Sequence, residues 1–143
     1  MNTKFFKTLL VFVLVGLGSS AQILNNSVVA SGQFMGSDSM HKAQGQVALV
    51  KMNQGLYLNL AKEFKVTEGP DLFLMLRNSR NSKVGMFIVN PLKQYSGAQM
   101  YKVNLTEQDL IKYDQVIVYC KRFSALFGSA ALTFNPKAFV GYK

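Results

Sequence analysis

Five consecutive apolar residues, Leu72-Phe73-Leu74-Met75-Leu76, follow the turn-forming sequence Gly69-Pro70-Asp71 and hold the main clue to the fold. Side chains alternate between the two faces of a β-strand, so a strand over this run is apolar on both faces. A second run, Val116-Ile117-Val118-Tyr119-Cys120, has the same property. Both runs are therefore predicted to be central strands of a sheet. In the second run, Val116, Val118 and Cys120 share one face, opposite Ile117 and Tyr119.

From Ser31 onward, short apolar runs alternate with turn formers, a pattern typical of strands. Further strands are expected at residues 33–35, 46–51, 56–60, 86–89, 100–104 and 130–134. Asn53-Gln54-Gly55 predicts a hairpin, and Thr106 with Asp109 predicts a capped helical turn too short to contribute to the core. About eight strands without long helices predict an all-β fold, an antiparallel β-sandwich with two sheets packed face to face.

The first residues have the pattern of a cleavable signal peptide. Lys4 and Lys7 precede an unbroken apolar stretch at residues 9–17, and a cut is expected between Ala21 and Gln22. The alternative is a membrane anchor, but a bilayer-spanning helix needs about 20 apolar residues, so no stable membrane span is expected after cleavage. The expected organisation is a signal peptide over residues 1–21, a loose tail or edge strand over 22–30, and one domain over 31–135. The expected location is secreted or periplasmic.

The chain is basic, with 16 Lys and Arg against 7 Asp and Glu and a net charge of +9. These cations are mostly scattered singly, without a block of like charges or an arginine-rich stripe. A groove that follows nucleic-acid phosphates needs clustered cations, so a solvated surface is the expectation and nucleic acid is not an expected partner. Weak attraction to anionic lipid or to a cell-wall polymer stays open.

One histidine, His41, and one cysteine, Cys120, exclude several chemistries. A Ser-His-Asp hydrolase would have to use His41, yet no Gly-x-Ser-x-Gly sequence is present. Zinc sites take several His or Cys ligands and blue-copper sites need two histidines, so no metal site is assigned. The sequences typical of covalent haem attachment and of phosphate loops are missing. Asp38 and Asp71 have no defined pairing, which ranks a carboxylate enzyme last and leaves open whether the protein is an enzyme.

Cys120 is the candidate redox residue. A lone cysteine cannot form an internal disulfide, so in an oxidising compartment it is sealed in the core, paired with another molecule, or used chemically. Lys121 and Arg122 follow it, and positive charge close to a thiol favours the reactive thiolate. The alternative is that Cys120 acts as a small buried hydrophobe.

Met35, Met40 and His41 lie close together in the sequence. They could supply soft ligands to Cu(I), or an axial ligand to a non-covalent haem alongside Cys120. The alternative is that the methionines are ordinary core filler. Haem and copper are thus open as cofactors, and none is required.

Several short motifs together resemble the DM-13 domain family over essentially the whole mature chain. They are Ser31-Gly32-x-Phe34, His41 followed by Gly45-x-Val47, Gly69-Pro70-Asp71-Leu72, Gly97-x-Gln99-x-Tyr101, Tyr113-x-x-Val116-x-Val118-x-Cys120-x-x-Phe123 and Phe127-Gly128-x-Ala130-x-Leu132. The resemblance implies a β-sandwich module of exported proteins with an electron-transfer role and a redox partner protein. It also implies that Cys120 is the redox centre, as a bare thiol or as a ligand to a group such as haem. His41 is the second candidate for binding that group.

The resulting hypothesis is an exported domain with a redox or electron-transfer role centred on Cys120. The alternative is a non-catalytic extracellular adhesion or carbohydrate-binding module, for which sandwiches with exposed aromatic residues are suitable. The partner and the oligomeric state are left open by the sequence.

Overall fold

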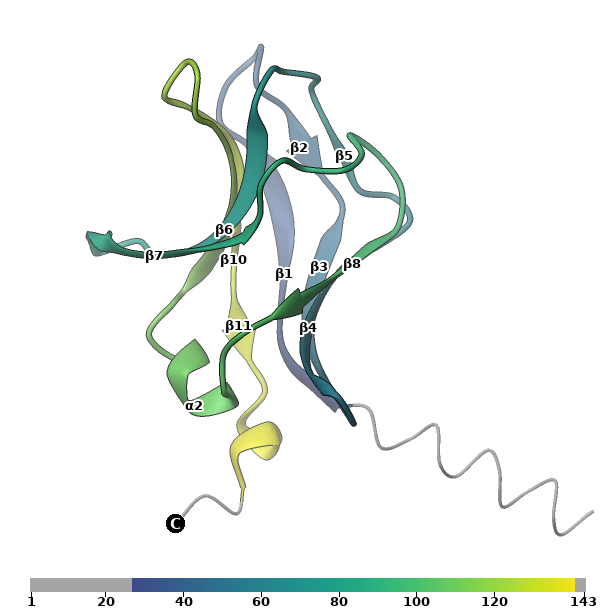
Figure 1. Ribbon diagram of the computed structural model, residues 1–143, viewed down its shortest axis with the longest axis vertical. Coiled ribbons are helices and arrows are strands. Elements are labelled where there is room, and N and C mark those ends of the chain that lie inside the picture. The colour runs from purple at the N-terminus through teal and green to yellow at the C-terminus, as the bar shows by residue number, and fades with distance from the viewer. Residues whose placement is uncertain (1–26, 141–143) are drawn as a thin grey trace, which may run out of the picture.

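The computed structural model describes residues 27–140, which are built almost entirely from β-strands (Figure 1). In chain order, the elements are β1 (Ser27–Gly36), β2 (Ala43–Gln44), β3 (Gln46–Met52), β4 (Gly55–Leu60), β5 (Lys65–Val66), β6 (Leu72–Asn78), β7 (Asn81–Val89), β8 (Gln99–Val103), α2 (Glu107–Leu110), β9 (Gln115–Cys120), β10 (Ala125–Ala131), β11 (Thr133–Phe134) and the 3-10 helix η2 (Pro136–Phe139). The predicted all-β fold is confirmed.

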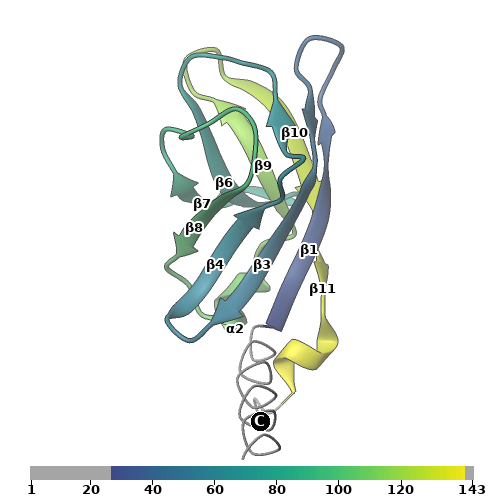
Figure 2. The same ribbon diagram turned by 90° about the vertical axis from the view of Figure 1, so that its right-hand side faces the viewer.

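One continuous antiparallel sheet provides both layers of the molecule. Its strand order is β7-β6-β9-β10-β1-β3-β4-β8, with β11 also paired to β1, while β2 and β5 form a separate small ladder. The long strand β1 joins the two halves, because residues 27–33 pair with β3 and residues 34–36 pair with β10. The sheet curls until its halves face each other (Figures 1 and 2). The predicted antiparallel sandwich is thus confirmed, and its two layers are halves of one sheet.

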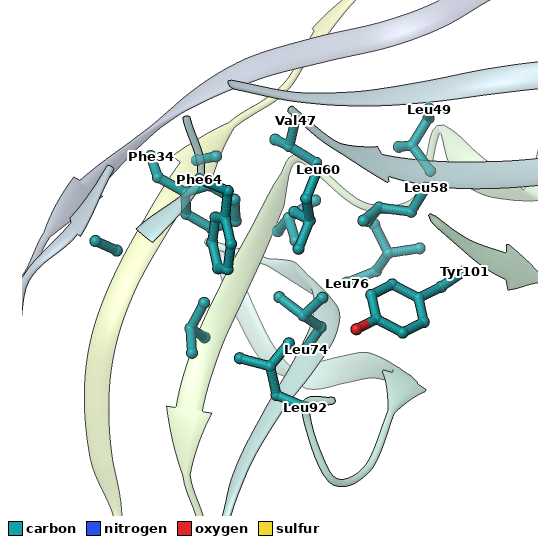
Figure 3. Packing of buried hydrophobic residues seen from close by; sticks show 14 of the residues in the cluster. Phe34, Val47, Leu49, Leu58, Leu60, Phe64, Leu74, Leu76, Leu92 and Tyr101 are labelled. Carbon is teal, nitrogen blue, oxygen red and sulfur yellow. The ribbon is translucent and has the colours of Figure 1, made fainter. Parts of the chain in front are cut away.

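The two runs with apolar residues on both faces form β6 and β9, which are neighbours in the interior of the sheet order. Leu74 and Leu76 of β6 and Val118 of β9 are fully buried between the layers. Figure 3 shows the leucines of β6 facing Leu58 and Leu49 of the opposite half. Full burial of a large aliphatic side chain contributes about 1.5–3 kcal/mol, so these strands hold the layers together.

Two local predictions have different outcomes. The hairpin at residues 53–55 is confirmed, and Gly55 has a φ of +128°, a conformation that favours glycine. Thr106 caps α2, since its Oγ1 accepts a hydrogen bond from the Asp109 N–H at 3.1 Å. The expectation that this turn does not contribute to the core is wrong, because Leu110 at its end is fully buried in the core cluster.

The expectation of a loose tail at the start of the domain is wrong for residues 27–30. They belong to β1 and pair with β3 on one side, and Ala30 pairs with Phe134 of β11 on the other. The signal-peptide prediction for residues 1–21, and the part of the predicted tail before Ser27, lie outside the described residues. Within residues 27–140, no helix is long and apolar enough to cross a membrane.

Candidate functional site

Cys120 is the last residue of β9 and points into the core. Its partners across the sheet are Leu72 of β6 and Ala125 of β10. The side chain has no exposed surface, and its Sγ donates a hydrogen bond to the carbonyl oxygen of Pro70 at 2.9 Å. The predicted face is confirmed, because Val116 and Val118 are buried in the same cluster. The sulfur therefore lies directly under the turn that precedes β6.

Two connecting segments lie at this end of the sandwich, one at residues 67–71 and one at residues 121–124 (Figure 1). They are joined by a hydrogen bond from the Lys121 N–H to the Asp71 carbonyl oxygen at 3.2 Å. Within residues 27–140, the non-glycine residues with positive φ are Asp71 at 62° and Ser124 at 49°, one in each turn. Left-handed backbone at a residue with a side chain stores modest strain, and such strain concentrates at functional sites.

The cations that follow Cys120 are separated from its sulfur by the geometry of the strand end. Lys121 and Arg122 are exposed on the turn, whereas the thiol is fully enclosed. Adjacent strand residues point to opposite faces, which directs Lys121 away from the sulfur, and Arg122 extends into solvent from the turn. The thiol is therefore out of reach of another molecule as long as the turn at residues 67–71 stays closed.

His41 lies in the loop between β1 and β2 and is held by Asp38. The Nδ1 atom of His41 lies 2.7 Å from the Asp38 Oδ2, and the Asp38 Oδ1 accepts hydrogen bonds from the N–H groups of His41 at 2.7 Å and Met40 at 2.8 Å. The side-chain hydrogen bond to His41, followed by these backbone hydrogen bonds, lowers the pKa of Asp38 to about 2. The loop therefore presents the imidazole in a fixed orientation.

Phe127 of β10 connects His41 to the cysteine turn. Its ring is tilted by 59° against the imidazole, with 4.5 Å between the ring centroids. The same ring also packs directly against Gly69, because a Cβ placed on this glycine would come within 2.8 Å of the Phe127 Cζ. The next residue, Pro70, accepts the Cys120 hydrogen bond. The structure thus brings both predicted site residues to one end of the molecule without direct contact.

The role of this phenylalanine was not predicted. Phe127 and the Gly69-Pro70 pair occur in the sequence motifs, but nothing in their spacing shows that they pack together. The absence of a side chain at Gly69, 58 residues before Phe127, is the feature that permits the contact. The Tyr95 hydroxyl also donates a hydrogen bond to the Gly69 carbonyl oxygen at 3.0 Å, which holds the same turn.

The surroundings of Cys120 do not fit a haem or a copper ion. No surface of the sulfur is open to an approaching metal, and its hydrogen is donated to Pro70. Phe127 stands between this turn and His41, and the described residues contain no group of three or more His, Cys, Asp or Glu side chains that could hold a metal ion. Met35 and Met40 are 71% and 76% exposed, so neither is core filler.

Two surface hollows lie away from this end of the molecule. One, of about 290 Å³, is lined by residues of β1, β3 and β11, and the other, of about 430 Å³, lies beside β4 and β8. Neither is lined by Cys120 or His41.

Comparison with known proteins identifies the family. The family model described as "Electron transfer DM13" matches residues 33–132, a span that includes both turns, His41, Phe127 and Cys120. No curated protein and no solved structure matches the chain. Because the match covers well over half of the sequence, the chain belongs to the DM13 electron-transfer family.

Proposed function

We propose that this protein is an exported thiol-based redox domain in which Cys120 is the reacting group and the turn at residues 67–71 controls access to it. The family match supports a general redox role in preference to adhesion or carbohydrate binding. Within residues 1–21, two lysines followed by an apolar stretch support export to the periplasm or the medium. Residues 31–135 would then form the functional domain. Such compartments are oxidising, so disulfides are available as reaction partners there.

One observation carries the proposal. The only sulfur of the chain that can undergo thiol exchange is held by a turn carbonyl at 2.9 Å, and that turn is itself fastened by contacts at the molecular surface. A single neutral hydrogen bond contributes about 0.5–1.5 kcal/mol. The turn is also held by hydrogen bonds between Thr67 and Lys42 and by the packing of Gly69 against Phe127. Opening breaks these contacts but leaves the paired strands and the core in place, so it requires less free energy than unfolding of the sandwich.

The proposed reaction is a thiol–disulfide exchange. When the turn opens, the Cys120 thiol loses its proton and the thiolate attacks one sulfur of a disulfide on a partner molecule. The partner's S–S bond breaks, a new S–S bond joins Cys120 to the attacked sulfur, and the released sulfur takes up a proton. The partner's released sulfur is thereby reduced and Cys120 is oxidised. Since the chain has one cysteine, a thiol of another molecule must release Cys120 afterwards.

Reversible reaction with glutathione tests the function. The mature chain is incubated without denaturant in mixtures of oxidised and reduced glutathione, and the intact mass is measured. We expect the folded protein to gain the mass of one glutathione and to lose it when reduced glutathione is added, whereas Cys120→Ser gains none. An adduct that forms only in unfolding concentrations of urea would show that the thiol is structural and would overturn the proposal.

A further inference from the structure

The half-sheet β7-β6-β9-β10 has a second apolar face, turned away from the core. Phe73 and Ile117 are 3% and 1% exposed, yet they do not belong to the core cluster between the layers. Phe73 pairs with Tyr119 across the strands, with ring centroids 5.5 Å apart, and its ring lies 4.8 Å from that of Phe87. Phe87 is 52% exposed and opens this cluster to solvent. We call the outward residues Phe73, Met75, Phe87, Ile117 and Tyr119 the aromatic face.

Charge is distributed unevenly around this face. Residues 72–89 and 115–131, which include all four strands and their hairpin turns, contain five cations and no Asp or Glu. One acidic residue lies at each end of the face: Asp114 accepts hydrogen bonds from Ser79 beside Arg80, and the Asp71 carbonyl oxygen accepts one from the Lys121 N–H. Elsewhere in the described chain, acidic residues are interspersed among the cations. The cations of these two segments are Arg77, Arg80, Lys83, Lys121 and Arg122.

These cations lie at the two ends of the aromatic face. Arg77 follows Phe73 and Met75 on the outward side of β6, and its Nη2 donates a hydrogen bond to the Gln115 Oε1 at 2.9 Å. Arg80 is in the turn between β6 and β7, whereas Lys121 and Arg122 are in the turn after β9. The two ends are separated by the six residues of β9. At roughly 3.3 Å per residue, this strand is about 20 Å long.

Phe87, with the half-buried Met75 and Tyr119, supplies the accessible apolar surface of this face, and Phe73 and Ile117 support it from beneath. An apolar centre with a polar rim is the usual composition of a protein–protein interface. A length of about 20 Å also fits the dimensions of a standard interface, which buries about 800 Å² on each partner. Five cations against the two flanking acidic residues, Asp71 and Asp114, leave an excess of positive charge at the ends of this face. This excess complements a protein surface with acidic groups around an apolar centre. The same face begins beside the cysteine, because Tyr119 directly precedes Cys120 on β9.

We propose that the aromatic face, with its cationic rim, is the docking surface for an acidic protein that serves as the redox partner of this domain. The partner's role rests on the proposed function, whereas its docking depends on this face and not on the thiol. The face and the closed turn share one end of β9, so a protein seated there lies next to the point where Cys120 would become accessible.

Binding can be measured with defined probes. The ¹⁵N-labelled mature chain is titrated by NMR with poly-L-glutamate, and separately with vesicles of phosphatidylserine and of phosphatidylcholine. We expect poly-L-glutamate to shift amide signals of β6, β7, β9 and the turn at residues 121–124. Charge reversal by Lys121→Glu with Arg122→Glu is expected to weaken this binding roughly tenfold, since like charges at an interface repel.

The matched control reverses two exposed lysines outside this half-sheet, Lys62→Glu with Lys102→Glu, and changes the net charge equally. It is expected to weaken binding much less than the test pair, with both variants checked for folding by their NMR spectra. Cys120→Ser is expected to bind as the wild type does, which separates docking from the thiol chemistry. Three results would overturn the proposal: shifts centred on β4 and β8, equal weakening by both variants, or binding to phosphatidylserine vesicles without binding to poly-L-glutamate.

Discussion

Substitution of Gly69 by alanine should open the turn that covers Cys120. The new Cβ would lie 2.8 Å from the Phe127 Cζ, 3.0 Å from its Cε1 and 3.3 Å from the Leu72 Cδ2. These distances require a shift, and an aromatic ring packed between Gly69 and His41 has little freedom to move. Overpacking of this kind costs about 1–3 kcal/mol. Because the clash disappears when the turn leaves Phe127, the opening equilibrium should rise roughly 5- to 150-fold.

The assay is the rate at which the folded protein reacts with 5,5′-dithiobis(2-nitrobenzoate), an aromatic disulfide that reports each thiol by colour. The matched control is Gly85→Ala in β7, whose Cβ would come equally close, 2.8 Å, to the Met75 Cε but far from the cysteine turn. Urea unfolding of both variants corrects for any change in overall stability. We expect Gly69→Ala to react faster and Gly85→Ala to react at the wild-type rate. A wild-type rate for Gly69→Ala, or equal acceleration by Gly85→Ala, would refute the local opening of the turn.

Two further predictions concern the core and pH. Leu110→Ala should lower the free energy of unfolding in urea by about 2–5 kcal/mol because it empties a fully buried site, whereas Ile111→Ala, at a position 64% exposed, should change it by less than about 0.5 kcal/mol. A destabilisation by Ile111→Ala as large as that by Leu110→Ala would contradict this packing. The second prediction concerns pH. The pKa of Asp38 is lowered from 3.8 to about 2 by its hydrogen bonds, the first of them to the His41 side chain. The stabilising effect of the ionised carboxylate on the folded loop is therefore present above about pH 4 and is lost as the pH falls through 2. NMR should show the ring signals of His41 and Phe127 shifting together in that range, and the same titration in Asp38→Asn would count against the assignment.

The central strands and the confirmed local turn could be predicted because their signals are local. A run such as 72–76, apolar at every position, can be buried only where both of its faces are covered, and this places β6 inside the sheet. The cap at Thr106 depends on a residue three positions away, so it is also visible in the sequence.

The features that were missed depend on contacts between distant segments. Residues 27–30 are part of the sheet because they pair with β3, while residues 34–36 of the same strand pair with β10, and no local pattern indicates that β1 joins the two halves. The enclosure of Cys120 depends on Pro70, and the position of His41 depends on Phe127. Strand alternation allows Lys121 to point away from the sulfur, but the sequence does not show that the strand ends at Cys120 and leaves both cations exposed on a turn.

The redox function requires Cys120 to become accessible without unfolding of the domain. The most direct measurement compares two rates under the same native conditions: reaction of Cys120 with 5,5′-dithiobis(2-nitrobenzoate), and global opening measured by hydrogen exchange of the slowest amides of β9. We expect the thiol to react much faster than the domain unfolds, because only the turn at residues 67–71 has to move. Equal rates would mean that the thiol is exposed only by global unfolding, and would contradict a redox role for Cys120.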